Sequence, residues 1–287
     1  MIGESLTVAL ISDVFHGAGG SDRLHARLDE ARARGAALAV LPELALNPWS
    51  PASRTSRDED AEPPAGIRHQ LLSDAAKRAG IGVIGGAIVL SRESGRRHNT
   101  TLIFDREGRL VSQYAKVHLP EEEGFWETSH YEPGMTCADV VREFGMPLGV
   151  QVCSDINRPV GSQILVALGA EAIINPRATE AATFDRWRLV FRAVAMTTSA
   201  YVLSVNRPAA ELGVPLGGPS VVVGPGGDVI VESHDPIVVA TLDRAVITAA
   251  RRRYPGYLAS YATLYRDGWQ AVANRLRAHG IGPDPRD

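Results

Sequence analysis

Residues 148–155 read Leu148-Gly149-Val150-Gln151-Val152-Cys153-Ser154-Asp155. The first five residues are mostly apolar and predict a buried strand, and a helix is expected from near Pro159. Cys153 would then occupy a turn between a strand and a helix. A nucleophile on such a turn is exposed, the next backbone N–H groups point at its substrate, and a helix N-terminus favours the thiolate. A buried structural cysteine is the alternative.

Two other reactive side chains also follow expected strands. Glu43 comes directly after the apolar run at residues 37–41 and Pro42, and a partly desolvated carboxylate suits a general base for a thiol. Lys116 follows a hairpin strand, where its ammonium can lie near a developing oxyanion. Taken singly, Glu43 is better explained by a pair with an arginine, and Lys116 by a place on the surface.

The fold class follows from how strands, helices and hairpins are mixed. Strand–helix units alternate along the chain, and two hairpins interrupt them at residues 100–114 and 220–232. This mixture favours a mixed sheet or two sheets covered by helices over a purely parallel α/β sheet. Strands are further expected at residues 6–11, 82–90, 172–175 and 201–205, and helices at residues 21–34, 70–79, 161–168 and 184–198.

The composition is that of an ordinary soluble protein. The chain has 287 residues, of which 45 % are hydrophobic and 22 % charged, and its net charge is −3. This balance gives no reason to expect binding to nucleic acid or to a membrane surface. There is no apolar run of bilayer length and no signal-peptide pattern at residues 1–4, so a cytoplasmic location is expected.

No linker or repeat divides the sequence, which predicts a single domain over residues 1–287. A tail rich in aromatic residues, from about 254 to 287, would pack on its own domain or on a partner subunit. The two cysteines are too few for a disulfide scaffold and are expected to be free thiols. Cys137, in Thr136-Cys137-Ala138, is interpreted as a buried structural cysteine.

Two motifs are set aside because their context is wrong. Residues 80–85 match the dinucleotide fingerprint, but the glycines follow an expected helix and precede an expected strand, the reverse of what that site needs. The acidic segment from His118 to His130 has no regular metal-ligand spacing and is interpreted as a solvated loop.

Glu43, Lys116 and Cys153 occur in this order, each after a strand, and the arrangement resembles the nitrilase superfamily of carbon–nitrogen hydrolases, in particular its amidase and carbamoylase branch. The resemblance runs from about residue 6 to about residue 243. It implies an α/β fold with mixed sheets in a four-layer αββα sandwich. It also implies a Glu-Lys-Cys triad, no metal or organic cofactor, and a homodimer or larger homo-oligomer.

The resemblance implies a second glutamate that precedes a Pro-Gly pair and positions the lysine or the substrate. Glu127 lies eleven residues after Lys116 and ahead of Pro133-Gly134, whereas the run of glutamates at residues 121–123 resembles a solvated loop.

Four further residues are candidates for the substrate pocket. The Ser154 N–H would bind the oxyanion, and Trp49 and Trp126 lie close to the two glutamates in the sequence. Arg177 follows a strand whose end should neighbour the Cys153 strand, so its guanidinium could hold a substrate carboxylate. Plain packing explains the aromatic residues as well, and pairing with Glu180 or Asp185 would explain Arg177.

Departures from the family pattern narrow the function. Cys153-Ser154-Asp155 stands where true nitrilases usually have Cys-Trp-Glu, which favours an amidase. Arg158-Pro159-Val160 replaces an aromatic-Pro-Glu segment and leaves the substrate group open. Ile156 and Asn157 stand where some carbamoyl-amino-acid hydrolases have two arginines, which disfavours that substrate class.

The expected function is therefore that of a cysteine amidohydrolase. It would cleave a non-peptide C–N bond of a small amide or N-carbamoyl compound through a thioester and release ammonia or an amine. Nitrile hydrolysis and acyl transfer to an amine are alternatives within the enzymes. A catalytically silent binding or scaffold protein is the alternative of another class.

Overall fold

The computed structural model describes residues 3–279. The chain divides into two compact units, residues 1–256 and residues 257–287, and each is described by itself. The described part of the second unit contains helix α6 (Ala262–Ala278). Packing of the tail on a partner subunit stays a prediction. Within residues 3–279, no helix combines the length and the apolar character needed to cross a bilayer.

The first unit contains a seven-stranded sheet within its described residues. Its strand order is β14-β1-β2-β4-β5-β6, and β3 pairs with β4. The core strands β1, β2 and β4 are parallel, whereas β5, β6 and β14 run antiparallel to their neighbours. The strands are β1 (Ser5–Ile11), β2 (Leu38–Val40), β3 (Ala61–Glu62), β4 (Gly82–Leu90), β5 (Arg97–Phe104), β6 (Leu110–Ala115) and β14 (Ile237–Asp243).

A second sheet has five strands among the described residues, in the order β13-β12-β11-β10-β9. Strands β9, β10 and β11 are parallel, and β12 and β13 form an antiparallel hairpin on the edge of β11. The strands are β9 (Leu148–Val150), β10 (Ala172–Arg177), β11 (Tyr201–Asn206), β12 (Ser220–Val223) and β13 (Val229–Ser233).

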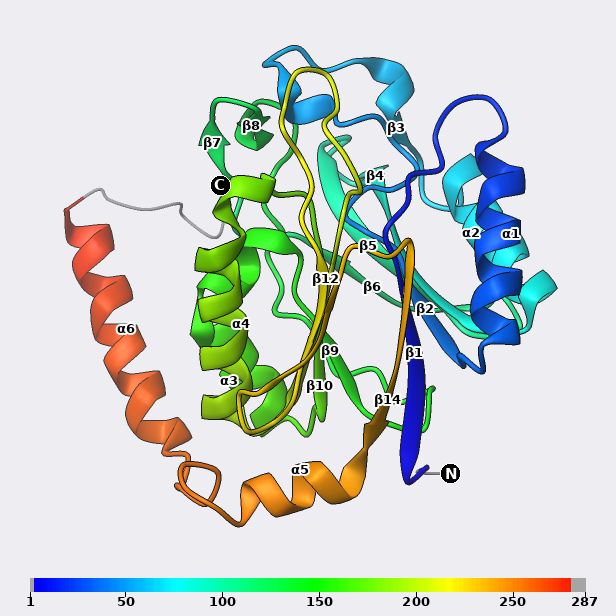
Figure 1. Cartoon of the computed structure of the whole chain (residues 1–287). Coiled ribbons are helices and arrows are strands. Elements are labelled where there is room, and N and C mark those ends of the chain that lie inside the picture. The colour runs from blue at the N-terminus through cyan, green and yellow to red at the C-terminus, as the bar shows by residue number, and fades with distance from the viewer. Residues whose placement is uncertain (1–2, 280–287) are drawn as a thin grey trace. The chain divides into compact units, whose positions relative to one another are not determined.

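The two sheets pack face to face, and helices cover both outer faces (Figure 1). In β1, Val8 and Leu10 point into the layer between the sheets, whereas Ala9 and Ile11 point outward to the helices. This alternation is the period of two that a strand imposes on its side chains. Four helices form the outer layers: α1 (Gly20–Ala33) and α2 (Ile67–Ala79) on the first sheet, and α3 (Pro159–Ala167) and α4 (Phe184–Thr198) on the second.

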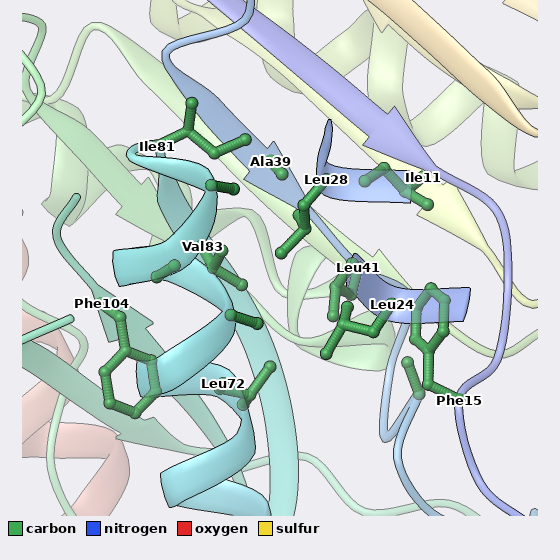
Figure 2. Packing of buried hydrophobic residues seen from close by; sticks show 14 of the residues in the cluster. Ile11, Phe15, Leu24, Leu28, Ala39, Leu41, Leu72, Ile81, Val83 and Phe104 are labelled. Carbon is green, nitrogen blue, oxygen red and sulfur yellow. The ribbon is translucent and has the colours of Figure 1, made fainter. Parts of the chain in front are cut away.

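The predicted αββα sandwich is thus confirmed. Figure 2 shows Leu24 and Leu28 of α1 and Leu72 of α2 packed over the first sheet. Strand β4 and helix α4 have the predicted bounds, and Gly80, with φ 67°, ends α2 just before β4. Strand β14 and helix α5 (Arg244–Arg251) are not among the predicted elements; β14 closes the first sheet against β1.

Candidate active site

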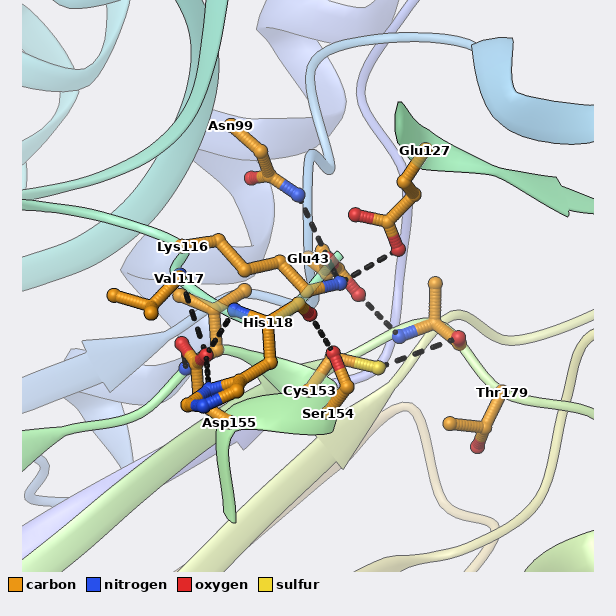
Figure 3. Close-up of polar contacts among 12 residues, drawn as sticks. Glu43, Asn99, Lys116, Val117, His118, Glu127, Cys153, Ser154, Asp155 and Thr179 are labelled. Atoms are coloured by element: carbon orange, nitrogen blue, oxygen red, sulfur yellow. Dashed lines mark hydrogen bonds and ion pairs between the residues drawn. The ribbon is translucent and has the colours of Figure 1, made fainter. Parts of the chain in front are cut away.

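The structure brings four predicted residues together, from both sheets (Figure 3). Glu43 lies just past β2 and Lys116 directly after β6, both in the first sheet. Cys153 lies just past β9 of the second sheet, and Glu127 begins a short 3₁₀ turn, Glu127–Ser129. All four residues are at most 4 % exposed, so their charges interact at low dielectric.

Lys116 joins the two glutamates. Its Nζ donates to Glu43 Oε1 at 2.8 Å and to Glu127 Oε1 at 2.6 Å, and the Asn99 amide also donates to Glu43 Oε1, at 2.8 Å. The other Glu43 oxygen, Oε2, accepts from the backbone N–H of Ala178 at 3.0 Å. The Glu43 carboxylate is therefore held by three donors that come from both sheets.

Burial and charge act in opposite directions in this cluster. Burial alone would lower the pKa of Lys116, but Glu127 and Glu43 outweigh it and raise that pKa well above its ordinary value. Burial raises the pKa of Glu127 to about 8, against the opposing effect of Lys116 and with a further increase from Glu43. Glu127 therefore binds a proton more readily than an exposed carboxylate does, although it is paired with Lys116.

Cys153 lies in the left-handed region, with φ 46°, which is rare for a residue with a side chain. Its carbonyl accepts from the Asn175 amide at 3.1 Å, and its Sγ donates to the carbonyl of Ala178 at 3.7 Å. Strained residues of this kind cluster at functional sites.

The resting sulfur is a thiol, because burial raises the pKa of Cys153 well above its ordinary value, Glu43 adds to the increase, and Lys116 opposes it. The thiolate expected from the sequence is therefore not the favoured form, although α3 begins at Pro159 as predicted. A thiol in this state needs a base before it can attack.

Asp155 ties the turn of the cysteine to the segment that follows the lysine. Its Oδ1 accepts from the backbone N–H of Val117 and from both the backbone N–H and the imidazole of His118, at 3.2, 2.9 and 2.8 Å. Its Oδ2 accepts from the Tyr114 hydroxyl at 2.9 Å and from the backbone N–H of Val152 at 3.2 Å. Asp155 thus fixes the first sheet's lysine segment against the second sheet's cysteine turn.

A cavity of about 640 Å³ opens over the cysteine. Cys153, Ser154, Ala178 and Thr179 belong to its lining. The remaining lining residues are Pro120, Glu122, Glu123, Phe125, Asn157, Glu180, Thr183, Arg186, Trp187 and Val190. A larger cavity, of about 1080 Å³, lies beside α2 and the β4–β6 strands and contains none of the four clustered residues. The smaller cavity is therefore the candidate substrate site.

A model of the carbon–nitrogen hydrolase family matches residues 16–252 of this chain. The chain belongs to the carbon–nitrogen hydrolase family. The chloroplastic omega-amidase of Arabidopsis thaliana is 31 % identical over 240 residues, which are 79 % of this chain and 64 % of that protein. This chain thus spans less than two thirds of the length of that relative.

Another relative of this carbon–nitrogen hydrolase is omega-amidase NIT3 of Saccharomyces cerevisiae. It is 31 % identical over 232 residues, which are 76 % of this chain and 78 % of that protein. The crystal structure of Saccharomyces cerevisiae Nit3, a member of branch 10 of the nitrilase superfamily, is similar with a TM-score of 0.80 at 26 % identity, over 91 % of this chain and 97 % of that chain. The predicted membership of the nitrilase superfamily is confirmed.

Three residues predicted for the pocket do not line the cavity of this carbon–nitrogen hydrolase. Trp49 is fully buried, and its indole N–H donates to the carbonyl of Gly124 at 2.8 Å. Trp126 is half-buried, and the guanidinium of Arg54 stacks 3.8 Å from the centre of its ring. Of the four pocket candidates, Ser154 alone lies in the lining.

Arg177, the third, is fully buried and is not part of the cavity lining. Its guanidinium donates to Thr179 Oγ1 at 3.2 Å, to Ser204 Oγ at 2.7 Å and to the carbonyl of Pro219 at 2.6 Å. Burial lowers the pKa of Arg177 to about 9, while Cys153 acts in the opposite direction. The hydrogen bonds of Arg177 thus go to Thr179, Ser204 and Pro219, and not to the Glu180 or Asp185 side chains.

The sequence did not single out Asn99, Ala178 or the bracing role of Asp155. Asn99 and Ala178 contact Glu43 across 56 and 135 residues of chain, so no local pattern reveals them. Asp155 had one usable signal, because it lies two residues after the cysteine. Within residues 3–279 no three His, Cys, Asp or Glu side chains are grouped as metal ligands.

Proposed function

We propose that this carbon–nitrogen hydrolase is a cysteine amidohydrolase of small, non-peptide amides or N-carbamoyl compounds, acting through a thioester. The observation that carries the proposal is the buried Glu43–Lys116–Glu127 cluster beside a protonated Cys153 thiol at the lining of a cavity. The omega-amidase names of the two relatives support amides as substrates.

In the proposed mechanism, Glu43 accepts the proton of the Cys153 thiol as the sulfur attacks the carbonyl carbon, so a C–S bond forms. The resulting oxyanion is stabilised by the Lys116 ammonium and the backbone N–H of Ser154. Glu43 then returns the proton to the leaving nitrogen, the C–N bond breaks, and ammonia or an amine departs.

The thioester is hydrolysed by the same groups. Glu43 accepts a proton from a water molecule, which attacks the thioester carbon. The C–S bond then breaks, the acid is released, and the sulfur takes back the proton held by Glu43. Glu127 keeps Lys116 in place through both halves of the reaction.

The cavity wall favours neutral or cationic amides as substrates. It contains the carboxylates of Glu122, Glu123 and Glu180 and one guanidinium, that of Arg186. A wall of one predominant sign raises the local concentration of molecules of the opposite sign. A second candidate class, an amide that carries a remote carboxylate, is favoured by Arg186 and by the omega-amidase names of the relatives.

Ammonia release from amides matched in chain length tests the function and the class together. The set needs a neutral, a cationic and an anionic amide, an N-carbamoyl amine and a nitrile. We expect turnover of amides that is abolished by Cys153→Ala and kept by Cys137→Ala. The proposal would be overturned if the Cys153→Ala protein released ammonia as fast as the wild-type protein. Hydroxamate formation in the presence of added hydroxylamine would reveal acyl transfer.

We also propose that the enzyme acts in the cytoplasm as a homodimer or larger homo-oligomer. Both cysteines are free thiols, which suits a reducing compartment. Cys137 is exposed, so its interpretation as a buried structural cysteine is wrong. Light scattering on the purified protein tests the oligomer, and a monomer at micromolar concentration would refute it.

A further inference from the structure

A second fully buried arginine lies next to the residue that is proposed as the base. Arg207 directly follows β11 and has no solvent exposure. One terminal nitrogen donates to the carbonyls of Glu43 and Leu44, at 3.0 Å each. The other donates to the carbonyl of Asn47 at 3.0 Å and to Glu211 Oε2 at 2.6 Å.

These bonds bind the segment from residue 43 to residue 49 at both ends. Glu211, which is paired with Arg207, also accepts from the backbone N–H of Trp49, through Oε1 at 2.8 Å. Arg207 and Glu211 therefore contact the first residue, the last residue and two residues between. The proposed mechanism gives neither of them a chemical step.

The segment needs such an anchor because its backbone is strained. Leu44 has φ 49°, in the left-handed region that residues with a side chain rarely adopt. Such a conformation is unfavourable and persists only where its surroundings enforce it. A single Arg207 nitrogen donates to the carbonyls of Glu43 and Leu44, which belong to the peptide groups just before and just after the Leu44 Cα.

Only a guanidinium meets this set of acceptors. It presents five N–H donors in a fixed plane, so it can reach three carbonyls and a carboxylate at once. A lysine would keep the positive charge but has three donors on one atom, which cannot span residues 43 to 47 and Glu211 together.

We propose that Arg207 is a positioning residue for the general base: it sets the aim of the Glu43 carboxylate by fixing the backbone on which that side chain stands. This inference rests on the proposed function, since it takes Glu43 to be the base. A small displacement of a reacting group can lower the rate by about 10²-fold. The Glu43 carboxylate itself, held by Lys116, Asn99 and Ala178, would still bind its neighbours but in a shifted geometry.

The test compares Arg207→Lys with Arg244→Lys, both made in a Cys137→Ala background that leaves one thiol. Arg244 is a matched control: it also donates to two backbone carbonyls, of Gly3 and Gly145, and pairs with Glu171. Glu171 directly precedes β10, so this pair lies at the end of that strand opposite to Arg177. Both variants lose comparable hydrogen bonds, but only one of them lies beside Glu43.

Arg207→Lys should lower kcat for an amide by about tenfold or more, with KM changed by less than about twofold, because the base and not the cavity is displaced. Alkylation of Cys153 by iodoacetamide at alkaline pH, where hydroxide replaces the base, should keep its wild-type rate. Arg244→Lys should lose thermal stability and keep kcat.

An unchanged kcat in folded Arg207→Lys protein would overturn the inference. It would also be overturned if kcat and the rate of Cys153 alkylation at alkaline pH fell by the same factor, because that result indicates a collapsed site. If Arg207→Lys does not fold, Glu211→Gln takes its place, with an expected loss of about threefold to tenfold in kcat; wild-type turnover there overturns the inference. The proposed function itself is refuted if the wild-type protein hydrolyses no amide, or if the Cys153→Ala protein still hydrolyses it.

Discussion

Replacing Lys116 by Met should test the buried charge cluster most directly. Methionine keeps most of the volume of the lysine stem but removes the ammonium, which lies 2.8 Å from Glu43 and 2.6 Å from Glu127, with all three side chains fully buried. Removing one partner of a buried ion pair costs about 3–5 kcal/mol, because the remaining charge is left uncompensated. For a domain of this size, that cost lowers Tm by roughly 6–20 °C.

The pH dependence of this loss has a definite sign. The pKa of Glu127 is raised to about 8, above its unfolded value, so the folded protein retains a proton that the unfolded chain releases. The contribution of Glu127 to stability therefore falls as pH rises between the unfolded pKa and about 8. Without Lys116 the cost of ionised carboxylates grows, so the deficit of Lys116→Met should be largest near pH 8 and should shrink toward about pH 5.

Thermal unfolding followed by circular dichroism at both pH values measures the deficit. Lys77→Met is the matched control, since Lys77 is exposed on α2 and is the chain's only other lysine. Its Tm should hardly change, because most surface substitutions alter the free energy of unfolding by no more than about 0.5 kcal/mol. Turnover of Lys116→Met should fall by about 10²-fold or more with the loss of the oxyanion partner. The description of the cluster would be refuted if Lys116→Met lowered Tm no more than Lys77→Met does, or if its loss of Tm grew as the pH fell.

Three further predictions concern single side chains. Cys153→Ser should fold and lose turnover, whereas Cys137→Ala should keep most of its activity, as ammonia release will measure. Glu127→Gln should lower kcat about 10-fold or more by loosening Lys116, whereas Glu122→Gln in the cavity lining should change kcat little. Equal effects of the two changes would show that Glu127 is not the carboxylate that positions the lysine. Arg177→Lys should lower Tm, with about 2 kcal/mol lost from unpaired buried acceptors, and should affect neutral and acidic amides alike; a rise of KM for acidic amides alone would show that Arg177 reaches the substrate after all.

The sequence could predict Glu43, Lys116 and Cys153 from local patterns together with the resemblance to the nitrilase superfamily, and Glu127 from that resemblance alone. Each of these three residues follows an apolar or hairpin strand, but no local pattern shows that Glu43 and Lys116 belong to one sheet and Cys153 to the other. Trp49 and Arg177 lie outside the cavity lining because contacts far along the chain hold their side chains. Trp49 is turned inward by a carbonyl of Gly124, which is 75 residues away, and Arg177 by a carbonyl of Pro219, 42 residues away.

Strand β14 shows the same limit at the level of the fold. Its residues Ile237–Asp243 pair with β1 at the other end of the unit, Ser5 opposite Asp243. A local pattern can indicate an extended segment but not the partner that it pairs with, since that choice depends on the packing of the whole sheet. The cavity likewise combines residues from loops after β9 and β10 with helix α4, and their meeting has no local signal.

The reactive group and its activators belong to opposite halves of the sandwich. Glu43 and Lys116 extend from the first sheet, Cys153 and Ala178 from the second, and hydrogen bonds from Ala178 to Glu43 and from His118 to Asp155 cross between the halves. A nascent or partly unfolded chain with only one sheet formed would therefore carry a cysteine without a base and an ammonium without a target. Chemistry is available only after the halves dock, so the return of turnover during refolding would report the assembly of the sandwich, later than the return of secondary structure.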